Sequence, residues 1–434
     1  MLTYASLFIS TLLYTIVFDL PKGDVNMKTI GIITEYNPFH LGHQYMIEEA
    51  KKKTGADRVV VVMSGNFVQR GEPAFFSKWT RAKAALTNGV DMVLELPVLF
   101  ATANAETFAC AAVRILEETG LVDTLCFGSE SGDLATLQEA AKLMSNETEE
   151  FRSLLKANLD EGMSYPTARS KALEMISSIN SEILSQPNHI LALEYLKALA
   201  RYQCKMLPMT IKREGAAYHG TSLEDKFASA SAIRRGISED QTRAALKQVP
   251  ENCFDLYNDA LSLGMAPIVW KNYAGPLNYK LRAMSAEELR NIFEVTEGLE
   301  NRILRSIDTC YEVEDIIEFI KSKRYTRTKI QRILLHILLD IKETEVDYFM
   351  KKSRMPYIRV LGFRKENAEI LGDLTINTKC PVLTNLKKAP EILDEDGLHL
   401  LALEKAATDL HAMAAPNTLY RSPNQDFTMP MAII

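Results

Sequence analysis

From residue 28 to about residue 243, short runs of β-branched and other apolar residues alternate with longer stretches of helical periodicity. Five runs are predicted strands: Thr29–Thr34, Arg58–Met63, Met92–Leu96, Thr124–Gly128 and Met209–Lys212. Six stretches are predicted helices: Gly42–Lys53, Lys78–Asn88, Ala105–Glu118, Leu134–Met144, Glu149–Asp160 and Ile190–Tyr202. Continuously apolar strands separated by helices are typical of a parallel sheet that is covered on both faces. The predicted fold class is therefore α/β, and such sheets bind ligands beyond the carboxyl ends of their strands.

The remainder of the 434 residues differs in character. Residues 244–350 are predicted to form a helical domain, because no β-rich run occurs there. Residues 351–434 are predicted to form a small C-terminal α+β region, with strands at Tyr357–Leu361 and Pro381–Thr384 and a helix at Leu398–Met413. Residues 27–243 would then form the ligand-binding domain, in a chain long enough for two or three domains.

Residues 1–26 do not match the rest of the sequence. Leu2–Phe18 is uncharged and mostly apolar, but no basic residue precedes it, as a secretory signal would require. Met27 stands directly before the first predicted strand, so we expect Met27 to be the natural start and the leader to be an over-extended reading frame. A membrane anchor is the alternative.

Composition narrows the function only a little. The formal net charge is −6, so a nucleic-acid partner would need a local basic surface on an acidic body. The six cysteines are scattered without a CxxC pair, which indicates reduced thiols in a cytoplasmic protein. No metal site made of protein side chains is predicted, and no membrane or protein partner is inferred.

The strongest motif is Asn37-Pro38-Phe39-His40-Leu41-Gly42-His43, which follows the first predicted strand and opens the first predicted helix. A helix start presents free N–H groups and partial positive charge to an anion. His40 and His43 are three residues apart, so both should face the same side of that helix start. Two imidazoles beside a phosphate suit a reaction in which charge builds on that phosphate. The alternatives are a satisfied histidine pair in a turn, or a metal site with no third ligand in view.

This motif resembles the HxGH signature of the nucleotidyltransferase superfamily, whose Rossmann-like fold is a parallel sheet with helices on both faces. The resemblance implies that His40 and His43 are catalytic, stabilising the α-phosphate of ATP as pyrophosphate leaves. Ala228-Ser229-Ala230-Ser231-Ala232-Ile233-Arg234 is similar to the second superfamily element, a helix start that binds the β- and γ-phosphates. Ser229 and Ser231 would donate to phosphate there, and Arg234 would bind it with two hydrogen bonds.

Other stretches resemble one family in particular, the tRNA(Met) cytidine acetate ligases. They are Glu35-Tyr36-Asn37, Met63–Pro73, Phe127–Glu130, Gln186–Leu191 and Ile211–Gly215. The resemblance implies that acetate and ATP, with Mg²⁺, give acetyl-adenylate, and that the acetyl group passes to the wobble cytidine of elongator tRNA(Met), giving N4-acetylcytidine. It implies an ATP site made of Ile33, Thr34, Glu35, Tyr36, Asn37, Pro38, Phe39, His40, Leu41, Gly42, His43, Gln44, Tyr45, Met46, Gly128, Asn188 and Arg213, together with Ser229, Ser231 and Arg234.

The remaining candidates rest on single residues and charge runs. Asn66, Gln69 and Arg70, in the loop after the second predicted strand, are expected to line the acetate or acceptor pocket, and Lys78 is expected to reach a phosphate. A polar loop and a solvated lysine are the alternatives. Two basic clusters are candidates for binding tRNA, unless they are merely solvated faces; their residues are Lys323, Arg324, Arg327, Lys329 and Arg332 in the first, and Lys351 and Lys352 in the second.

Two other functions remain open at this stage. An adenylyltransferase acting on a phosphorylated small molecule would share the ATP-binding domain but would not need the last 190 or so residues. An RNA-binding scaffold with a vestigial nucleotide site would not need the histidines or Arg234.

Overall fold

The computed structural model describes residues 27–145, 148–177, 179, 186–214, 223, 227–296 and 298–434. The expectations about the leader, residues 1–26, lie outside the described residues. Within the described residues, no helix has the length and apolarity needed to cross a membrane.

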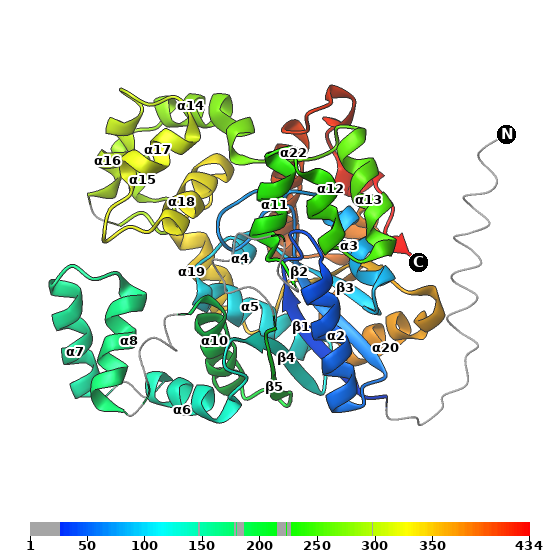
Figure 1. Ribbon diagram of the computed structural model, residues 1–434. Coiled ribbons are helices and arrows are strands. Elements are labelled where there is room, and N and C mark those ends of the chain that lie inside the picture. The colour runs from blue at the N-terminus through cyan, green and yellow to red at the C-terminus, as the bar shows by residue number, and fades with distance from the viewer. Residues whose placement is uncertain are drawn as a thin grey trace.

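A single central sheet organises the molecule (Figure 1). Its strand order is β5-β4-β1-β2-β3-β6-β7, with β8 paired to β6. The first five strands run parallel to one another, which confirms the predicted α/β fold. Their bounds are Thr29–Thr34 for β1, Arg58–Ser64 for β2, Met92–Leu96 for β3, Thr124–Ser129 for β4 and Leu207–Lys212 for β5.

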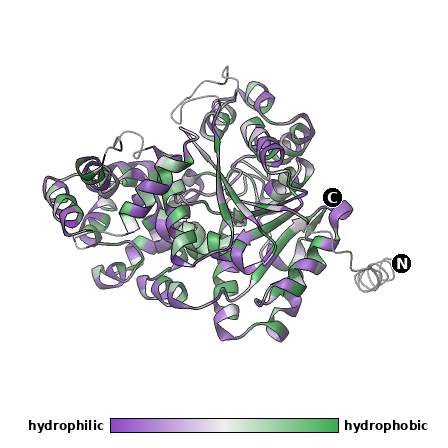
Figure 2. Ribbon diagram, turned by 90° about the horizontal axis from the view of Figure 1, so that it is seen from below, coloured by the Kyte–Doolittle hydropathy of each residue, from purple (hydrophilic) through white to green (hydrophobic). Residues whose placement is uncertain are grey.

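Helices cover both faces of this sheet because successive strand residues point to opposite sides. In β2, Val60 and Val62 face one hydrophobic core, and Val59 and Val61 face the other. The first core is closed by α5 (Ala105–Glu118), α6 (Leu134–Ser145) and α10 (Pro187–Arg201). The second is closed by α2 (Leu41–Thr54), α3 (Lys78–Thr87), α11 (Ala230–Ser238) and α13 (Glu251–Ser262). Figure 2 shows the strands as a hydrophobic layer between these helices.

Two helical parts stand beside the sheet (Figure 1). The hairpin of α7 (Glu149–Asp160) and α8 (Tyr165–Ile176) projects from α6 and α10. The second part has its own hydrophobic core and consists of α14 (Ala274–Ala283), α15 (Ala286–Arg290), α16 (Leu299–Ser306), α17 (Val313–Ile320) and α18 (Arg327–Leu339), followed by α19 (Glu343–Lys351). Its named elements are helical; α13, which also lies within residues 244–350, packs instead against α3 and the core beside the sheet.

The C-terminal residues extend the central sheet, which the sequence did not predict. Strand β6 (Ile358–Phe363) pairs antiparallel with β3, and β7 (Val382–Leu383) and β8 (Ala432–Ile433) pair with β6. Close packing requires glycine at residue 362, because a Cβ there would lie 2.4 Å from the carbonyl oxygen of Ala432. The long helix α22 (Glu395–Met413) and the short α23 (Gln425–Thr428) pack beneath this edge of the sheet.

Candidate active site

A cavity of about 930 Å³ lies beyond the carboxyl ends of β1 and β4. The loops after β1, β2 and β5 contribute to its lining, together with Phe127 and Gly128 near the carboxyl end of β4, as the parallel topology predicts. The segment directly after Leu96 does not, because it turns into the buried helix α4 (Val98–Ala101). The cavity continues outward between α8 and the N-terminal end of α18.

The two histidines of the motif lie at the start of α2 and line the cavity. Nδ1 of His40 accepts a hydrogen bond from the N–H of Gly42 at 3.0 Å, and Nδ1 of His43 accepts from the N–H of His40 at 3.3 Å. The two rings stack with centroids 3.8 Å apart. Because Nδ1 is an acceptor in both rings, a neutral imidazole must carry its proton on Nε2. The backbone N–H groups of the helix start thus fix both rings, and each ring keeps its Nε2–H as a hydrogen-bond donor.

The electrostatic environment keeps both imidazoles neutral. Burial, reinforced by the positive charge of Arg213, lowers the pKa of His40 to about 3. Burial also holds the pKa of His43 well below its usual range, with further contributions from His40 and Arg213. At neutral pH the site therefore presents uncharged donors within a positive field, an arrangement suited to a charge that develops during the reaction.

The two predicted phosphate elements meet at this cavity. Ser229 caps α11 by accepting from the N–H of Ala232 at 3.1 Å. Arg234, one turn further along α11, donates to the carbonyl oxygen of Asn37 at 2.8 Å and to Oε2 of Glu72 at 2.9 Å. Ser229, Ser231 and Arg234 all line the cavity. The fold thus brings together residues almost 200 positions apart in the sequence, since 197 separate Asn37 from Arg234.

A second group of predicted residues closes the side of the cavity next to β4 and β5. Arg213 donates to Oδ1 of Asn188 at 3.1 Å, and the Asn188 amide donates to Oε1 of Glu130 at 2.7 Å. Gly128 lies against Arg213, since a Cβ at residue 128 would lie 3.4 Å from Cγ of that arginine. Gly128, Asn188 and Arg213 line the cavity.

Most of the predicted ATP-binding residues therefore share one cavity, with four exceptions. Pro38, Phe39, Leu41 and Gln44 do not line it. Phe39 is fully buried behind the helix start, where its N–H donates to the hydroxyl of Tyr257 at 3.0 Å. Phe39 therefore supports the loop from behind and does not form part of its surface.

The predicted acetate or acceptor group divides into two pairs. Gln69 and Arg70 line the cavity, whereas Asn66 and Lys78 do not. Oδ1 of Asn66 accepts from the N–H of Lys78 at 2.8 Å, in the interior of the protein. The Lys78 ammonium is fully buried and lies 2.7 Å from Glu95 and 2.7 Å from Asp426. We correct the expectation for Lys78: it cannot reach a phosphate in the cavity.

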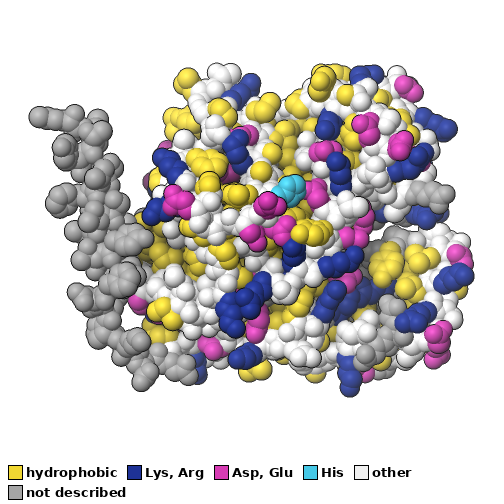
Figure 3. Space-filling model, turned by 180° about the vertical axis from the view of Figure 1, so that it is seen from behind, with side chains coloured by type: hydrophobic (Ala, Val, Ile, Leu, Met, Phe, Trp, Pro, Cys, Tyr) yellow, Lys and Arg dark blue, Asp and Glu magenta, His cyan; other side chains and the backbone are white. Residues whose placement is uncertain are grey.

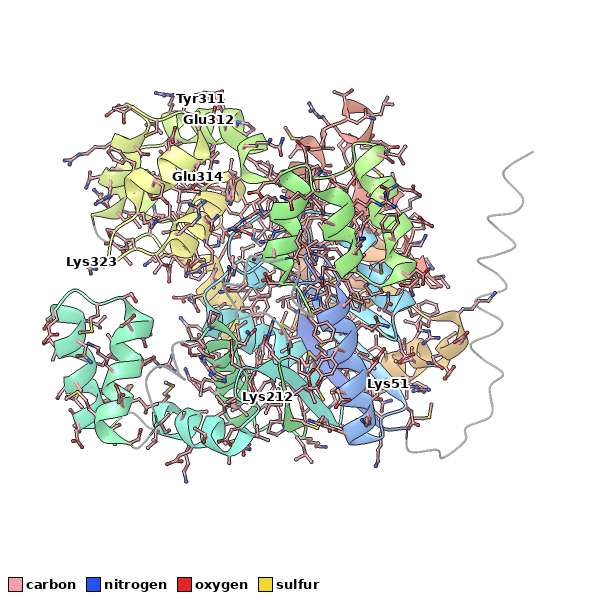
Figure 4. The ribbon with its side chains drawn as sticks, viewed as in Figure 1. Lys51, Lys212, Tyr311, Glu312, Glu314 and Lys323 are labelled. Atoms are coloured by element: carbon pink, nitrogen blue, oxygen red, sulfur yellow. The ribbon has the colours of Figure 1, made fainter. Side chains whose placement is uncertain are left out.

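The basic clusters need a similar correction, because several of their charges are paired across the fold. Arg332, one of the candidates for binding tRNA, is buried and forms two hydrogen bonds with Glu294, at 2.6 and 2.9 Å. Arg327 is paired with Glu314 on α17, and Lys352 with Asp396 on α22. Lys323 lies at the edge of the helical part (Figure 4), and Lys351 is exposed.

Arg324 and Lys329 remain, and both line the cavity together with Arg332. Neither has a carboxylate partner among the residues that the structure describes. Each lies over the ring of Tyr325, at 5.7 and 5.5 Å from its centroid. On the opposite side, Tyr165 and Arg169 of α8 also line the cavity, which sequence reasoning missed because no motif surrounds them. Elsewhere, acidic and basic side chains are interspersed, as on the face in Figure 3.

Comparisons with known proteins agree with this geometry. The family model described as HIGH Nucleotidyl Transferase matches residues 27–426. A tRNA(Met) cytidine acetate ligase of Acetivibrio thermocellus is 41% identical, over 94% of this chain and 100% of that protein. One of Caldanaerobacter subterraneus subsp. tengcongensis is 40% identical, over 90% of this chain and 96% of that protein.

Solved structures give the same result. The crystal structure of Thermotoga maritima TmcAL in its apo form has a TM-score of 0.89 and 34% identity, over 94% of this chain and 100% of that one. The structure of the same protein bound with alpha-thio ATP has a TM-score of 0.87 and 33% identity, with equal coverage. The motif at the start of α2, the phosphate element at α11 and these relationships together show that the chain belongs to the tRNA(Met) cytidine acetate ligase family of HIGH nucleotidyltransferases.

Proposed function

We propose that this protein activates acetate with ATP as acetyl-adenylate and transfers the acetyl group to the wobble cytidine of elongator tRNA(Met), giving N4-acetylcytidine. The observation that carries this proposal is the meeting of both phosphate elements in one cavity, where two neutral histidines present Nε2–H donors. The names of the relatives, and the ATP analogue bound by one of them, support it.

In the first step an acetate oxygen attacks the α-phosphorus of ATP. A new P–O bond forms, the P–O bond to the β-phosphate breaks, and pyrophosphate leaves. His40 and His43 would donate to the α-phosphate as its charge rises, and the start of α11 with Arg234 would hold the leaving pyrophosphate. Binding of the nucleotide in this orientation uses the helix start at Gly42 as an anion site.

Magnesium would arrive with the nucleotide. No group of three or more His, Cys, Asp or Glu side chains in the described residues is arranged to hold a metal ion. In ATP-using enzymes Mg²⁺ is usually bound by phosphate oxygens of the nucleotide and by water, with few protein ligands, and we propose the same mode here. When bound, the ion would neutralise charge on the leaving pyrophosphate.

The acetate would lie beside Gln69 and Arg70. Both line the same cavity as the histidines, and Gln69 is held from two sides. Its N–H donates to Glu35 at 2.8 Å, and its side-chain amide donates to the carbonyl oxygen of Ala103 at 3.1 Å. An arginine on a loop fixed in this way suits a small carboxylate.

Isotope exchange between pyrophosphate and ATP tests the first step. We expect exchange that depends on acetate, since the adenylate forms reversibly only when a carboxylate attacks. Exchange that instead requires a phosphorylated acceptor would identify an adenylyltransferase of small molecules. No exchange with any acid would leave only an RNA-binding scaffold. Nucleoside analysis of tRNA after incubation with ATP and acetate then tests the second step.

The outer part of the cavity would receive the acceptor RNA. Replacing both Arg324 and Lys329 with serine should weaken tRNA binding at least tenfold, because both cations line the cavity without a carboxylate partner among the described residues. The slope of log affinity against log salt should fall by about one for each phosphate that the variant no longer binds. Filter binding across a salt series measures both effects.

Acetate-dependent exchange should persist in that double variant, because the phosphate elements are untouched. Lys53→Ser, an exposed lysine in the last turn of α2, is the matched control for loss of charge. Unchanged binding by the double variant would exclude this end of the cavity as the RNA site.

A further inference from the structure

Glu35 is one of six glutamates that line the cavity, and the structure pairs it with no lysine or arginine among the described residues. The other five have partners: Glu72, Glu106, Glu194 and Glu294 lie against arginines, and Glu214 accepts from the hydroxyl of Tyr45. Glu35 follows the last residue of β1 and lines the cavity with His40, Arg70 and Arg234. A triphosphate and an acetate bring negative charge to the same space, and a nearby carboxylate repels both. Adenylate formation needs no group in the role of Glu35, because the attacking acetate is already ionised. A carboxylate at this place would instead suit a ligand group that donates hydrogen bonds, which neither phosphate nor acetate does.

The surroundings hold Glu35 in a defined place. Arg81, a fully buried arginine of α3, donates to the backbone oxygen of Glu35 at 2.5 Å and to that of Ser64 at 3.1 Å. Oε1 of Glu35 accepts from the N–H of Gln69 at 2.8 Å. Within the described part of the chain, Oε2 has no hydrogen-bond partner, and it is not among the buried unpaired atoms. One oxygen is thus used by the protein, and the other is left for the cavity.

We propose, building on the function proposed above, that Oε2 of Glu35 binds the exocyclic amine of the acceptor cytosine and takes its proton during acetyl transfer. A carboxylate is the natural partner for the amine at C4 of cytosine, which offers only donors. Uridine carries a carbonyl oxygen at that position, which would face the carboxylate with lone pairs on both sides. Glu35 would therefore select the base as well as activate it.

The transfer step balances with this assignment. The amine nitrogen attacks the carbonyl carbon of acetyl-adenylate, a C–N bond forms, and the C–O bond to AMP breaks. AMP leaves with the electron pair of that bond, and the amine proton passes to the Glu35 carboxylate. Burial raises the pKa of Glu35, while the Gln69 N–H and the charges of Arg70 and Arg234 oppose that rise. A carboxylate of raised pKa is a stronger base than one in water.

The sharpest variant is Glu35→Gln. Its amide oxygen can still accept from the Gln69 N–H, so the loop beside the cavity keeps its support, but the base is lost. Because Glu35 also belongs to the predicted ATP site, we expect acetate-dependent pyrophosphate exchange to fall as well, but by less than tenfold. Single-turnover transfer from preformed acetyl-adenylate to tRNA should slow about 100-fold or more, the usual contribution of a positioned base. The rise of the wild-type transfer rate with pH, as the carboxylate ionises, should be absent in the variant.

Base selection gives a readout that a merely structural role would not move. As a competitive inhibitor of acetyl transfer by the wild-type protein, a tRNA with uridine at the acceptor position should bind at least tenfold more weakly than the tRNA with cytidine there. In Glu35→Gln the amide can donate to the uridine oxygen, so the ratio of the affinities for the cytidine and uridine tRNAs should fall severalfold. Glu106→Gln is the matched control, because Glu106 lines the same cavity but is half exposed, 3.5 Å from Arg201.

Two results would overturn this assignment. Transfer by Glu35→Gln within a few-fold of the wild type would show that no proton goes to Glu35. Parallel loss of exchange and transfer would place Glu35 in adenylate formation instead, for example beside the metal ion. A wild-type protein without acetate-dependent exchange is a distinct outcome, since it refutes the proposed function and this assignment with it.

Discussion

Replacing His40 with asparagine is expected to slow acetate-dependent adenylate formation by about 100- to 1,000-fold, the usual loss when one preorganised donor to a developing charge is removed. Asparagine is among the best helix caps, so its side chain can still accept from the N–H of Gly42 and preserve the start of α2. It cannot place an N–H where Nε2 of the imidazole stood. ATP binding should weaken much less than the rate, because the donor acts most strongly in the transition state.

Two measurements separate the chemistry from the fold. Pyrophosphate exchange gives the rate, and thermal unfolding gives the stability of the same samples. His40→Ala should lose the same activity and about 1 kcal/mol of stability as well, because alanine does not cap a helix. His399→Asn, which changes a histidine paired with Glu345 away from the cavity, is the control. Exchange by His40→Asn at the wild-type rate would exclude the imidazole from the reaction.

The sheet and the histidine motif could be predicted because each depends on a pattern within a short stretch of consecutive residues. Each of the five parallel strands is a short run rich in apolar residues, and the predicted bounds differ from the observed ones by two residues at most. The tautomers of His40 and His43 also follow from local geometry, since both acceptors bond to N–H groups of the same helix start. No distant contact was needed for either.

The charged residues could not be placed in the same way, because their partners are remote in sequence. Lys78 follows a good helix cap and looks like a solvated lysine, yet it bonds Glu404, 326 residues later. Arg332 lies among basic neighbours without an acidic residue, yet Glu294 reaches it from 38 residues earlier. Sequence gives the sign of a charge, but only the tertiary fold shows whether the charge is paired.

Loss of the Lys78 ammonium should destabilise the protein more than any change in the cavity. The ammonium lies among Glu95, Glu404 and Asp426, and Arg359 is the only other cation that pairs with these carboxylates in the described part of the chain. Burial, together with the charge of Glu95, raises the pKa of Glu404, which favours the protonated form of that carboxyl. Two cations then balance two carboxylates, and all lie within the protein interior.

Lys78→Met keeps the apolar length of the side chain and removes its charge. The variant leaves Glu95 and Asp426 with Arg359 alone, and breaking a buried ion pair in this way typically costs about 3–5 kcal/mol of unfolding free energy. Urea unfolding measures the loss. Lys83→Met, at an exposed position on the same helix, should change stability by no more than about 0.5 kcal/mol.

A second variant tests whether the stability loss of Lys78→Met comes from the unbalanced charge or from the changed side-chain volume. Adding Glu95→Gln to Lys78→Met removes one carboxylate and should recover part of the lost stability, whereas Glu95→Gln alone should destabilise the protein. The two changes are thus expected to be strongly non-additive in a double-mutant cycle. If the double variant is instead as unstable as the sum of its single changes, the loss comes from packing, and the interior tolerates the uncompensated charge.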